Sequence, residues 1–317
     1  MNYNILRNYC LSNAIDLRFN EPMERHTSLK IGGPADIAIF PDEASLSDII
    51  ELLRQENIPY LIIGKGTNVL VKDEGIQGAV LFTERMNGIA VKTEEQDVTS
   101  KEHTNGNTDE KTVVIQSGCP LQKLLSLSVE HGLSGLEGLV GIPGSVGGAI
   151  AGNAGSFGYE IKDVLHTVRL LMADGKIISL SRNEMEFGYR MSNLPLNSFI
   201  VGAYISLKCY DRQSVVKKVR NYMREKRLTQ PISKSSAGCV FKNPEGTSAG
   251  RLIDQAGCKG MREGAIEVSH LHANYFTNKR GGKATDFFRL MDFVVERVKE
   301  QFGILLEPEI KIIGRNR

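Results

Sequence analysis

The chain has 317 residues, of which 41% are hydrophobic and 24% charged, and this length and composition predict a globular protein of two or three packed domains. With 39 Lys plus Arg against 37 Asp plus Glu, the formal net charge is +2, which excludes the basic excess of a nucleic-acid-binding protein. No segment has the roughly 20 uninterrupted apolar residues of a membrane-spanning helix, and residues 1–11 lack the apolar core of a signal peptide, so we expect a cytoplasmic protein without membrane insertion.

Segments with helical periodicity alternate with short β-rich runs, which indicates mixed α and β structure. Residues 42–57 are predicted to form a helix and residues 59–63 a short buried strand. A loop follows this strand directly, and it consists of Gly64, Lys65, Gly66, Thr67 and Asn68. Such loops let backbone N–H groups approach a phosphate without a Cβ in the way. The loop matches neither the Walker pattern nor the dinucleotide fingerprint, because Val69 stands where a third glycine belongs, so an ordinary turn is an equal alternative.

The next part of the chain contains a polar interruption and two regular elements. Residues 93–111 are charged and almost free of apolar side chains, which predicts a mobile insertion between two strands. Residues 121–131 are predicted to form an amphipathic helix that ends at a glycine. Residues 168–172 and 176–180 flank an Asp-Gly pair and are predicted to form a β-hairpin.

A second glycine-rich run, residues 141–155, holds six glycines and three alanines. A hydrophobic core does not require such a run, and each glycine in regular structure costs roughly 0.5–1 kcal/mol relative to alanine. Close approach of the backbone to a large flat or anionic ligand explains the run better than a low-complexity loop does. Two glycine loops, each after a small α/β unit, predict a dinucleotide held between two subdomains.

The C-terminal third is predicted to contain two helices and a strand. Residues 214–228 form a basic helix, for which a solvated face is the simplest interpretation. Residues 285–302 repeat apolar side chains at spacings of three and four, so this helix packs in a core, and residues 309–313 alternate like a strand. The five cysteines include no Cys-x-x-Cys pair, and we expect most to be buried free thiols: Cys10, Cys119, Cys209, Cys239 and Cys258.

Six segments, in this order, carry a resemblance to a known family. They read HTSLKIGG at 26–33, GKGTN at 64–68, GIPGSVGG at 141–148, FGYRMS at 187–192, AGCVFKNP at 237–244 and EPEIKIIG at 307–314. Together they resemble the UDP-N-acetylenolpyruvoylglucosamine reductases, and the two glycine loops resemble those of the vanillyl-alcohol-oxidase type of flavoprotein. Only residues 1–20 and 93–111 fall outside the pattern.

The resemblance implies an α+β protein with an FAD-binding PCMH-type (vanillyl-alcohol-oxidase-like) flavin fold of two subdomains and a C-terminal α+β substrate-binding domain. The expected divisions are an N-terminal extension at 1–20, the flavin domain at 21–207 with subdomains at about 21–85 and 86–207, the substrate-binding domain at 208–303 and a C-terminal strand with Glu309 at 304–317. We also expect a monomer. The short connection after Pro244 resembles the second type of the family, which lacks a tyrosine loop that closes over the substrate.

The same resemblance implies FAD and NADPH as cofactors and UDP-N-acetylglucosamine enolpyruvate as substrate. The first loop contains no His or Cys, so we expect non-covalent flavin. The expected cofactor-binding residues are Gly64, Lys65, Gly66, Thr67, Asn68, Gly141, Ile142, Pro143, Gly144, Ser145, Gly148, Asn153 and Gly155.

Reduction of an enol ether beside a carboxylate requires a hydride donor, a proton donor and positive charge near the developing enolate. By resemblance, Arg190 and Glu309 flank the substrate carboxylate, Arg190 as a planar cation and Glu309 as a protonated hydrogen-bond donor. Cys239 stands where the commonest family pattern has a serine as proton donor. A thiol with an unperturbed pKa of about 8.5 is mostly protonated at neutral pH and can take that role, although a buried packing role is the alternative.

The diphosphate and sugar of the substrate require basic and hydrogen-bonding groups. The expected substrate-binding residues are Tyr189, Arg227, Lys242, Asn243 and His272, with Asn274 beside them, and Arg227 is preferred over its neighbour Lys226. His270 and His272, if they lie on a strand, share a face, but without a third ligand nearby we expect no metal. The alternative functions are an FAD oxidase or dehydrogenase acting on an alcohol or hydroxy acid, and a flavin- or nucleotide-sugar-binding regulator.

Overall fold

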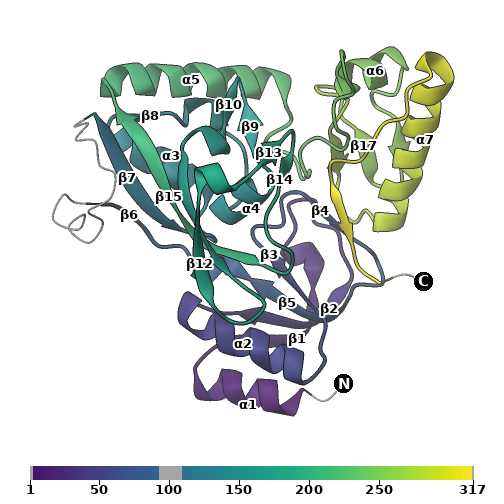
Figure 1. The fold of residues 1–317 in the computed structure, drawn as a ribbon. Coiled ribbons are helices and arrows are strands. Elements are labelled where there is room, and N and C mark those ends of the chain that lie inside the picture. The colour runs from purple at the N-terminus through teal and green to yellow at the C-terminus, as the bar shows by residue number, and fades with distance from the viewer. Residues whose placement is uncertain (1–2, 93–108, 316–317) are drawn as a thin grey trace.

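Three sheets, each covered by helices, organise the computed structural model, which describes residues 3–92 and 109–315 (Figure 1). Mixed α and β structure is therefore confirmed. In Figure 1 the second unit lies above the first, and the third lies beside the second with the C-terminal helix on its outer side. No helix in the described ranges is long and apolar enough to cross a membrane.

The first unit is a four-stranded sheet with the strand order β1-β2-β5-β3. Its elements are α1 (Asn4–Ser12), β1 (Asp16–Pro22), β2 (Pro34–Phe40), α2 (Glu43–Gln55), β3 (Tyr60–Ile63) and β5 (Ile76–Phe82). The helix and the strand predicted at 42–57 and 59–63 appear as α2 and β3. The Asp42 carboxylate accepts a hydrogen bond of 2.9 Å from the Ser45 backbone N–H, which fixes the start of α2.

The first twenty residues form part of this unit. Leu6 and Cys10 of α1 are buried in a cluster with Leu46 and Ile49 of α2, and β1 pairs antiparallel with β2. The segment expected as an extension is thus packed into the first sheet.

The second unit is an antiparallel sheet with the strand order β12-β11-β15-β7-β6, and β8 pairs with β15. Its elements are β6 (Ile89–Val91), β7 (Glu110–Gln116), α3 (Leu121–Glu130), β8 (Leu133–Ser134), α4 (Val146–Ala151), β11 (Leu165–Leu171), β12 (Ile177–Ser181), β15 (Phe199–Cys209) and α5 (Arg212–Thr229). The predicted hairpin is confirmed, because Val168 pairs with Leu180 and Leu171 with Ile177. The predicted helices at 121–131 and 214–228 appear as α3 and α5.

The polar insertion predicted at 93–111 lies between β6 and β7, which pair antiparallel. Residues 93–108 lie outside the described residues. The predicted insertion ends two residues too late. Glu110 and Lys111 already belong to β7, where they pair with Lys208 and Leu207. Their charged side chains are exposed, which explains why composition alone did not mark them as strand.

The third unit consists of a small antiparallel sheet packed against two helices. Its elements are α6 (Ala249–Gln255), β16 (Arg262–Glu263), β17 (Ile266–Val268), β18 (Phe276–Asn278) and α7 (Ala284–Phe302). The apolar stripe predicted at 285–302 faces the core, with Phe287, Met291 and Val294 buried. Gly303, with φ +69°, ends α7 in the left-handed conformation.

The chain then returns to the first unit, where β19 (Lys311–Ile313) pairs in parallel with β4 (Val69–Val71). The strand predicted at 309–313 is therefore shorter in the structure, because β19 begins at Lys311, two residues after the predicted start. The Glu309 backbone N–H donates to the Val240 carbonyl at 2.8 Å, so this part of the tail bonds to the third unit before β19 begins. The expected domain limits, 1–20, 21–207, 208–303 and 304–317, stay predictions.

Candidate active site

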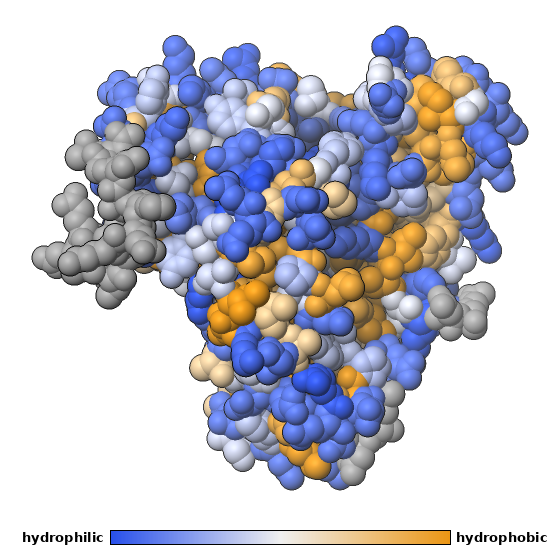
Figure 2. All heavy atoms as spheres, viewed as in Figure 1, coloured by the Kyte–Doolittle hydropathy of each residue, from blue (hydrophilic) through white to orange (hydrophobic). Residues whose placement is uncertain are grey.

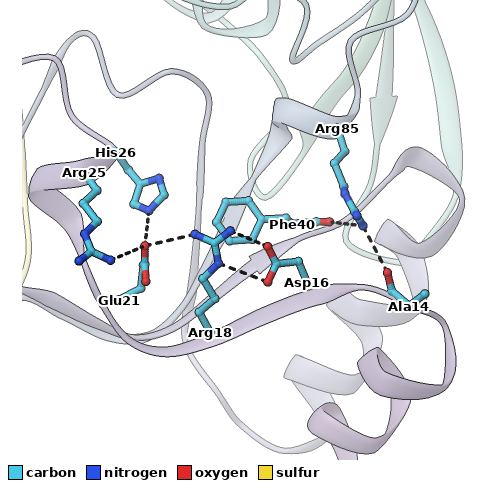
Figure 3. A network of polar contacts seen from close by, with 8 residues as sticks. All are labelled: Ala14, Asp16, Arg18, Glu21, Arg25, His26, Phe40 and Arg85. Atoms are coloured by element: carbon cyan, nitrogen blue, oxygen red, sulfur yellow. Dashed lines mark hydrogen bonds and ion pairs between the residues drawn. The ribbon is translucent and has the colours of Figure 1, made fainter.

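The first glycine loop, residues 64–68, joins β3 to β4 and is backed by the segment that carries His26. A Cβ on Gly66, where φ is +58°, would lie 2.0 Å from the His26 carbonyl oxygen, so only glycine fits there. His26 Nε2 lies 2.8 Å from Glu21 Oε1, and Arg18 reaches the same carboxylate (Figure 3). Burial raises the pKa of Glu21, but His26 and Arg18 hold it below its usual range. The network fixes the chain behind the loop.

The second glycine loop, residues 141–155, contains α4 and lies against the first. Thr67 Oγ1 donates to the Pro143 carbonyl at 3.3 Å. A Cβ on Gly64 would lie 2.2 Å from Ser145 Oγ, which shows how closely the two loops approach. All the expected cofactor-binding residues, from Gly64 to Asn68 and from Gly141 to Gly155, therefore lie along one strip of backbone.

This strip contains polar groups without protein partners. Within the described ranges, the backbone N–H groups of residues 64–68, Gly144 and Ser145 donate to no protein acceptor. Ser117 Oγ, beside the second loop, and Asn153 Oδ1, within it, are buried side-chain atoms without a hydrogen bond. Clustered backbone N–H groups bind anions, and buried unpaired polar atoms indicate a missing partner. The strip thus fits a dinucleotide that brings both phosphates and polar ring atoms.

Arg190 and Glu309 form an ion pair between the second unit and the C-terminal tail. Arg190 lies at the tip of the hairpin formed by β13 (Phe187–Gly188) and β14 (Met191–Ser192), with φ +57° (Figure 1). Its Nε donates to Glu309 Oε1 at 2.7 Å, and both side chains are largely buried. Burial raises the pKa of Glu309, whereas Arg190 acts to lower it, and the net direction is upward. Glu309 is therefore easier to protonate than an ordinary glutamate.

Cys239 lies close to the Arg190–Glu309 ion pair. Its backbone forms an isolated antiparallel β-bridge with Tyr275 in the third unit. Burial raises the pKa of the Cys239 thiol to about 12, Glu309 adds to this effect, and Arg190 and the Tyr275 hydroxyl oppose it. Tyr275 in turn donates to Gln230 Oε1 at 3.0 Å, just beyond the end of α5. The thiol is consequently protonated at neutral pH.

Lys226, rather than Arg227, faces the predicted catalytic residues. The Lys226 side chain is 2% exposed, and no described acidic residue pairs with it. Burial lowers the pKa of Lys226 to about 8, and the charge of Arg190 adds to this effect. Arg227 is exposed and lines a shallow groove of about 390 Å³ beside α5. The surface over α5 as a whole is mostly hydrophilic (Figure 2). The preference for Arg227 is therefore not supported by the geometry.

Tyr189, Lys242 and Asn243 lie at the exposed margin of the same region. The Tyr189 hydroxyl accepts a hydrogen bond of 3.4 Å from the Asn243 backbone N–H. Lys242 Nζ lies 3.3 Å from Glu307. The Asn243 side chain accepts from the Ala249 backbone N–H at the start of α6. The contact between Tyr189 and Asn243 crosses the boundary between the second and third units.

His272 and Asn274 occupy a turn, so His270 and His272 do not lie on a strand. The Ser269 hydroxyl accepts from the Leu271 and His272 backbone N–H groups, which curls the chain and removes the shared face. Burial lowers the pKa of His272. Asn274 bonds both backbone polar groups of Phe241, so it holds the segment after Cys239 in place. Among the described residues, no group of three or more His, Cys, Asp and Glu side chains is arranged to hold a metal ion.

Sequence reasoning missed Tyr275 and undervalued Lys226. Tyr275 directly follows the predicted site residues 269–274, but nothing local indicated that its side chain reaches Cys239. A signal for Lys226 did exist. Val215, Val219 and Lys226 are separated by four and seven residues, so Lys226 continues the inward stripe of α5.

Comparison with known proteins identifies two matching regions. A family model described as an FAD binding domain matches residues 34–181, and one described as the C-terminal domain of UDP-N-acetylenolpyruvoylglucosamine reductase matches residues 230–313. The first region contains the glycine loops up to β12, and the second contains Cys239 and Glu309. These matches confirm the expected combination of an FAD-binding domain with the C-terminal domain of this family.

Relatives over nearly the whole chain bear the same name. The UDP-N-acetylenolpyruvoylglucosamine reductase of Clostridium kluyveri is 37% identical over 303 residues, which cover 95% of this chain and 94% of the relative. That of Caldanaerobacter subterraneus is 38% identical over 300 residues, covering 94% of each chain. The crystal structure of the Thermus caldophilus enzyme has a TM-score of 0.75 and 31% identity, and the match covers 94% of this chain and 98% of that one. The chain therefore belongs to the UDP-N-acetylenolpyruvoylglucosamine reductase family.

Proposed function

We propose that this protein reduces the enolpyruvyl group of UDP-N-acetylglucosamine enolpyruvate with NADPH, by way of FAD, to form UDP-N-acetylmuramate for peptidoglycan. The observation that carries the proposal is the meeting of Arg190, Cys239 and Glu309 at the boundary between the FAD-binding region and the third unit. These side chains supply a cation, a protonated thiol and a carboxyl with a raised pKa. A cation and proton donors are what enol ether reduction needs from a protein.

FAD, held without a covalent bond, fits the strip formed by the two glycine loops. The unpaired backbone N–H groups of residues 64–68, Gly144 and Ser145 suit its phosphates. Bound there, FAD would supply the hydride chemistry between NADPH and the substrate carbon. Every other part of the reaction is assigned to side chains of this chain.

Arg190 and Glu309 hold the substrate carboxylate while the adjacent carbon gains negative charge. The planar guanidinium of Arg190 offers paired donors to two oxygen atoms, which a lysine does not. Glu309, with its raised pKa, donates a hydrogen bond when protonated. In the protein without substrate these two side chains bond each other at 2.7 Å, so the substrate carboxylate replaces part of that contact.

Cys239 gives its proton to the carbon next to the carboxylate. The S–H bond breaks, a C–H bond forms, and the electron pair of the enolate makes the new bond, which leaves a thiolate beside Tyr275. Because burial holds the pKa of Cys239 near 12, the thiolate is a strong base and recovers a proton readily from its neighbours or from water.

The diphosphate and sugar lie between α5 and the third unit. Lys226 supplies the buried positive charge, while Tyr189, Asn243 and Lys242 line the margin. His272, which burial keeps neutral, offers a hydrogen-bonding ring from the third unit. Arg227 lies further out and serves as a peripheral charge.

We further propose that the chain is of the type without a tyrosine loop. α6 begins at Ala249, five residues after Pro244, and Asn243 caps it, so this connection has no room for an inserted lid. Closure of the site then depends on other segments. A monomeric state, a cytoplasmic location and the domain limits predicted from the sequence belong to the same proposal.

Anaerobic flavin spectroscopy tests the function in two steps. NADPH should bleach the bound flavin, and UDP-N-acetylglucosamine enolpyruvate should then restore its colour without oxygen. An oxidase or dehydrogenase of alcohols would instead be reduced by such an alcohol, and a binding regulator would leave the flavin reduced after the enolpyruvyl compound is added. Either of these results would reject the proposed function.

Substitution of Gly144 tests the cofactor strip. Gly144 has φ +133°, and a Cβ there would lie 3.0 Å from Thr67 Oγ1, so Gly144→Val should separate the loops and lower flavin occupancy. Gly303→Val is a matched control, because Gly303 also has a positive φ but nothing within 4 Å. Acid or heat should release the flavin from the wild-type protein. Equal occupancy in both variants would contradict the assignment of the second loop.

A further inference from the structure

The hairpin that carries Arg190 is held by the end of the second glycine loop. Three hydrogen bonds join them. Asn153 Nδ2 donates to the Gly188 carbonyl at 3.0 Å, Ser192 Oγ donates to the Ala151 carbonyl at 2.8 Å, and Arg190 Nη1 donates to the Gly155 carbonyl at 3.3 Å. The position of the Arg190 guanidinium is therefore set by the same stretch of chain that borders the cofactor strip.

Within this stretch, only the Nδ2 group of the Asn153 carboxamide forms a hydrogen bond. Asn153 is 0% exposed. Because its Nδ2 faces the Gly188 carbonyl, the amide cannot be turned round without placing two oxygen atoms together. Its Oδ1 therefore has a fixed direction, and it is among the buried atoms that find no hydrogen bond within the described residues. A buried carbonyl oxygen without a donor is unfavourable, so a donor from outside the chain is expected at this point.

The backbone also indicates that asparagine is needed here. Asn153 has φ +40°, a left-handed conformation that asparagine tolerates better than most residues. It lies between α4 and β9 (Gly155–Ser156), in the loop whose other residues are predicted to bind the cofactor. The isoalloxazine ring of a flavin offers an N–H group in its pyrimidine ring when oxidised and a further one when reduced. It is thus a donor of the required kind.

We propose that Asn153, which the sequence already predicts to bind the cofactor, is in addition a positioning residue that joins the bound flavin to Arg190. Its Oδ1 accepts a hydrogen bond from a ring N–H of the flavin, and its Nδ2 fixes the Gly188 carbonyl at the base of the Arg190 hairpin. Flavin binding thereby sets the hairpin that presents Arg190 to the substrate. This inference rests on the proposed function, because it assigns a role within the same site.

Two variants separate the two sides of the carboxamide. Asn153→Asp retains an acceptor and the tolerance of a positive φ but loses the donor to Gly188. Asn153→Gly removes both groups without backbone strain. Asn197→Gly is the matched control, because Asn197 also has a positive φ, +57°, but is exposed on a loop.

We expect Asn153→Gly to weaken FAD binding about tenfold, the effect of one hydrogen bond, and to shift the visible absorption of the flavin. Asn153→Asp should retain FAD but bind it with a more negative reduction potential, because a carboxylate disfavours the anionic reduced ring. In both variants, reoxidation by UDP-N-acetylglucosamine enolpyruvate should slow about 10- to 100-fold when FAD is saturating, with a raised KM for that substrate. Asn197→Gly should match the wild type in every measurement.

Unchanged FAD affinity and absorption in Asn153→Gly would show that a water molecule satisfies Oδ1, and would overturn the bond to the flavin. Unchanged reoxidation in Asn153→Asp would overturn the link to Arg190. If the wild-type flavin were not reoxidised by the enolpyruvyl compound, the proposed function would fail, but the affinity and absorption measurements would still decide whether Asn153 contacts the flavin.

Discussion

The third unit contacts the other two in different ways. Towards the first unit it makes short bonds that involve backbone atoms: Ser28 Oγ donates to the Ser236 carbonyl at 2.7 Å, and Asn278 Nδ2 to the Leu29 carbonyl at 2.9 Å. The parallel pairing of β4 with β19 belongs to the same contact (Figure 1). Towards the second unit its hydrogen bonds involve side chains assigned to the site or adjacent to it, such as Glu309 with Arg190 and Tyr275 with Gln230.

The difference separates a structural contact from a functional one. Backbone bonds and strand pairing hold the third unit on the first, so Cys239 and Glu309 keep a fixed position relative to the first glycine loop. Asn68 Nδ2, within that loop, even donates to the Glu309 carbonyl at 3.3 Å. The contact with the second unit is made by fewer groups, and some of these must change partners when an anionic substrate enters. Loss of the first contact should therefore lower stability, and loss of the second should lower activity.

The largest effect is expected at Cys239, on the functional side. Cys239→Ala should leave anaerobic reduction of the flavin by NADPH near the wild-type rate, because this step requires no protein acid. Reoxidation by the enolpyruvyl substrate should slow by roughly two to four orders of magnitude, the usual contribution of a positioned general acid. Stopped-flow spectroscopy of each half-reaction measures the two rates separately.

Cys239→Ser should retain substantial turnover, since a hydroxyl takes this role elsewhere in the family, and Cys209→Ala controls for the loss of a thiol away from the site. If Cys239→Ala were reoxidised as fast as the wild type, Cys239 would be a packing residue, and Glu309 would be the next candidate for the acid. Equal slowing of both half-reactions would mean that the flavin site had been damaged.

At the contact between the first and third units, the largest loss of stability is expected when Asp73 is replaced. Its carboxylate in the first unit accepts from the Ala284 backbone N–H at 2.8 Å, from the Thr285 backbone N–H at 3.0 Å and from Thr285 Oγ1 at 2.7 Å, so it caps α7 from another unit. Asp73→Ala leaves these donors unpaired and should lower the free energy of unfolding by about 3 kcal/mol. Urea denaturation measures the loss. Asp211→Ala, which removes an exposed cap of α5, should cost less.

The contribution of Asp73 also has a predictable pH dependence. Burial raises its pKa, but the hydrogen bonds from Thr285 and Ala284 hold it below its usual range. A depressed folded pKa means that the stabilisation is present above the unfolded pKa of about 3.9 and is lost as pH falls through the folded value. The difference between the wild type and Asp73→Ala should therefore be constant near neutral pH and shrink in acid. A difference that persisted in acid would contradict the charged cap.

Local sequence patterns correctly predicted the helices and hairpins that are each formed by one contiguous segment of the chain. The apolar repeat at 285–302 predicted α7, and the Asp-Gly pair predicted the β11–β12 hairpin, because periodicity and turn chemistry act over a few residues. The cluster of Arg190, Cys239 and Glu309 was available only through resemblance to a family. These residues lie 49 and 70 positions apart along the chain, and no local pattern brings them together.

Other features depended on packing that local patterns do not contain. Lys226 and Arg227 differ in direction by about 100° on α5, and the choice between them is made by what the helix covers. A Cβ on Gly141 would lie 3.1 Å from Lys226 Cδ, so the inward side chain is the lysine. The turn that keeps His270 and His272 off a strand depends on the hydroxyl of Ser269. The packing of α1 on α2 depends on contacts over about forty residues of chain.

The smallest effect separates stability from activity at a single residue, Lys226. Burial lowers its pKa from 10.5 to about 8, so at neutral pH the folded protein holds an unfavourable buried charge. The unfolded chain binds this proton more tightly, and stability therefore rises with pH between about 8 and 10.5. Lys226→Met removes the penalty and should raise the free energy of unfolding at pH 7 by about 3 kcal/mol, with the gain vanishing towards pH 10.5. The same variant should lose affinity for the anionic substrate, and wild-type kcat/KM should fall as Lys226 loses its proton near pH 8.

Lys218→Met, at an exposed position of α5 beside Glu137, should not be stabilised in this way. A Lys226→Met protein that was less stable at pH 7, or as active as the wild type, would show that this lysine serves the packing of α5 rather than the binding of substrate.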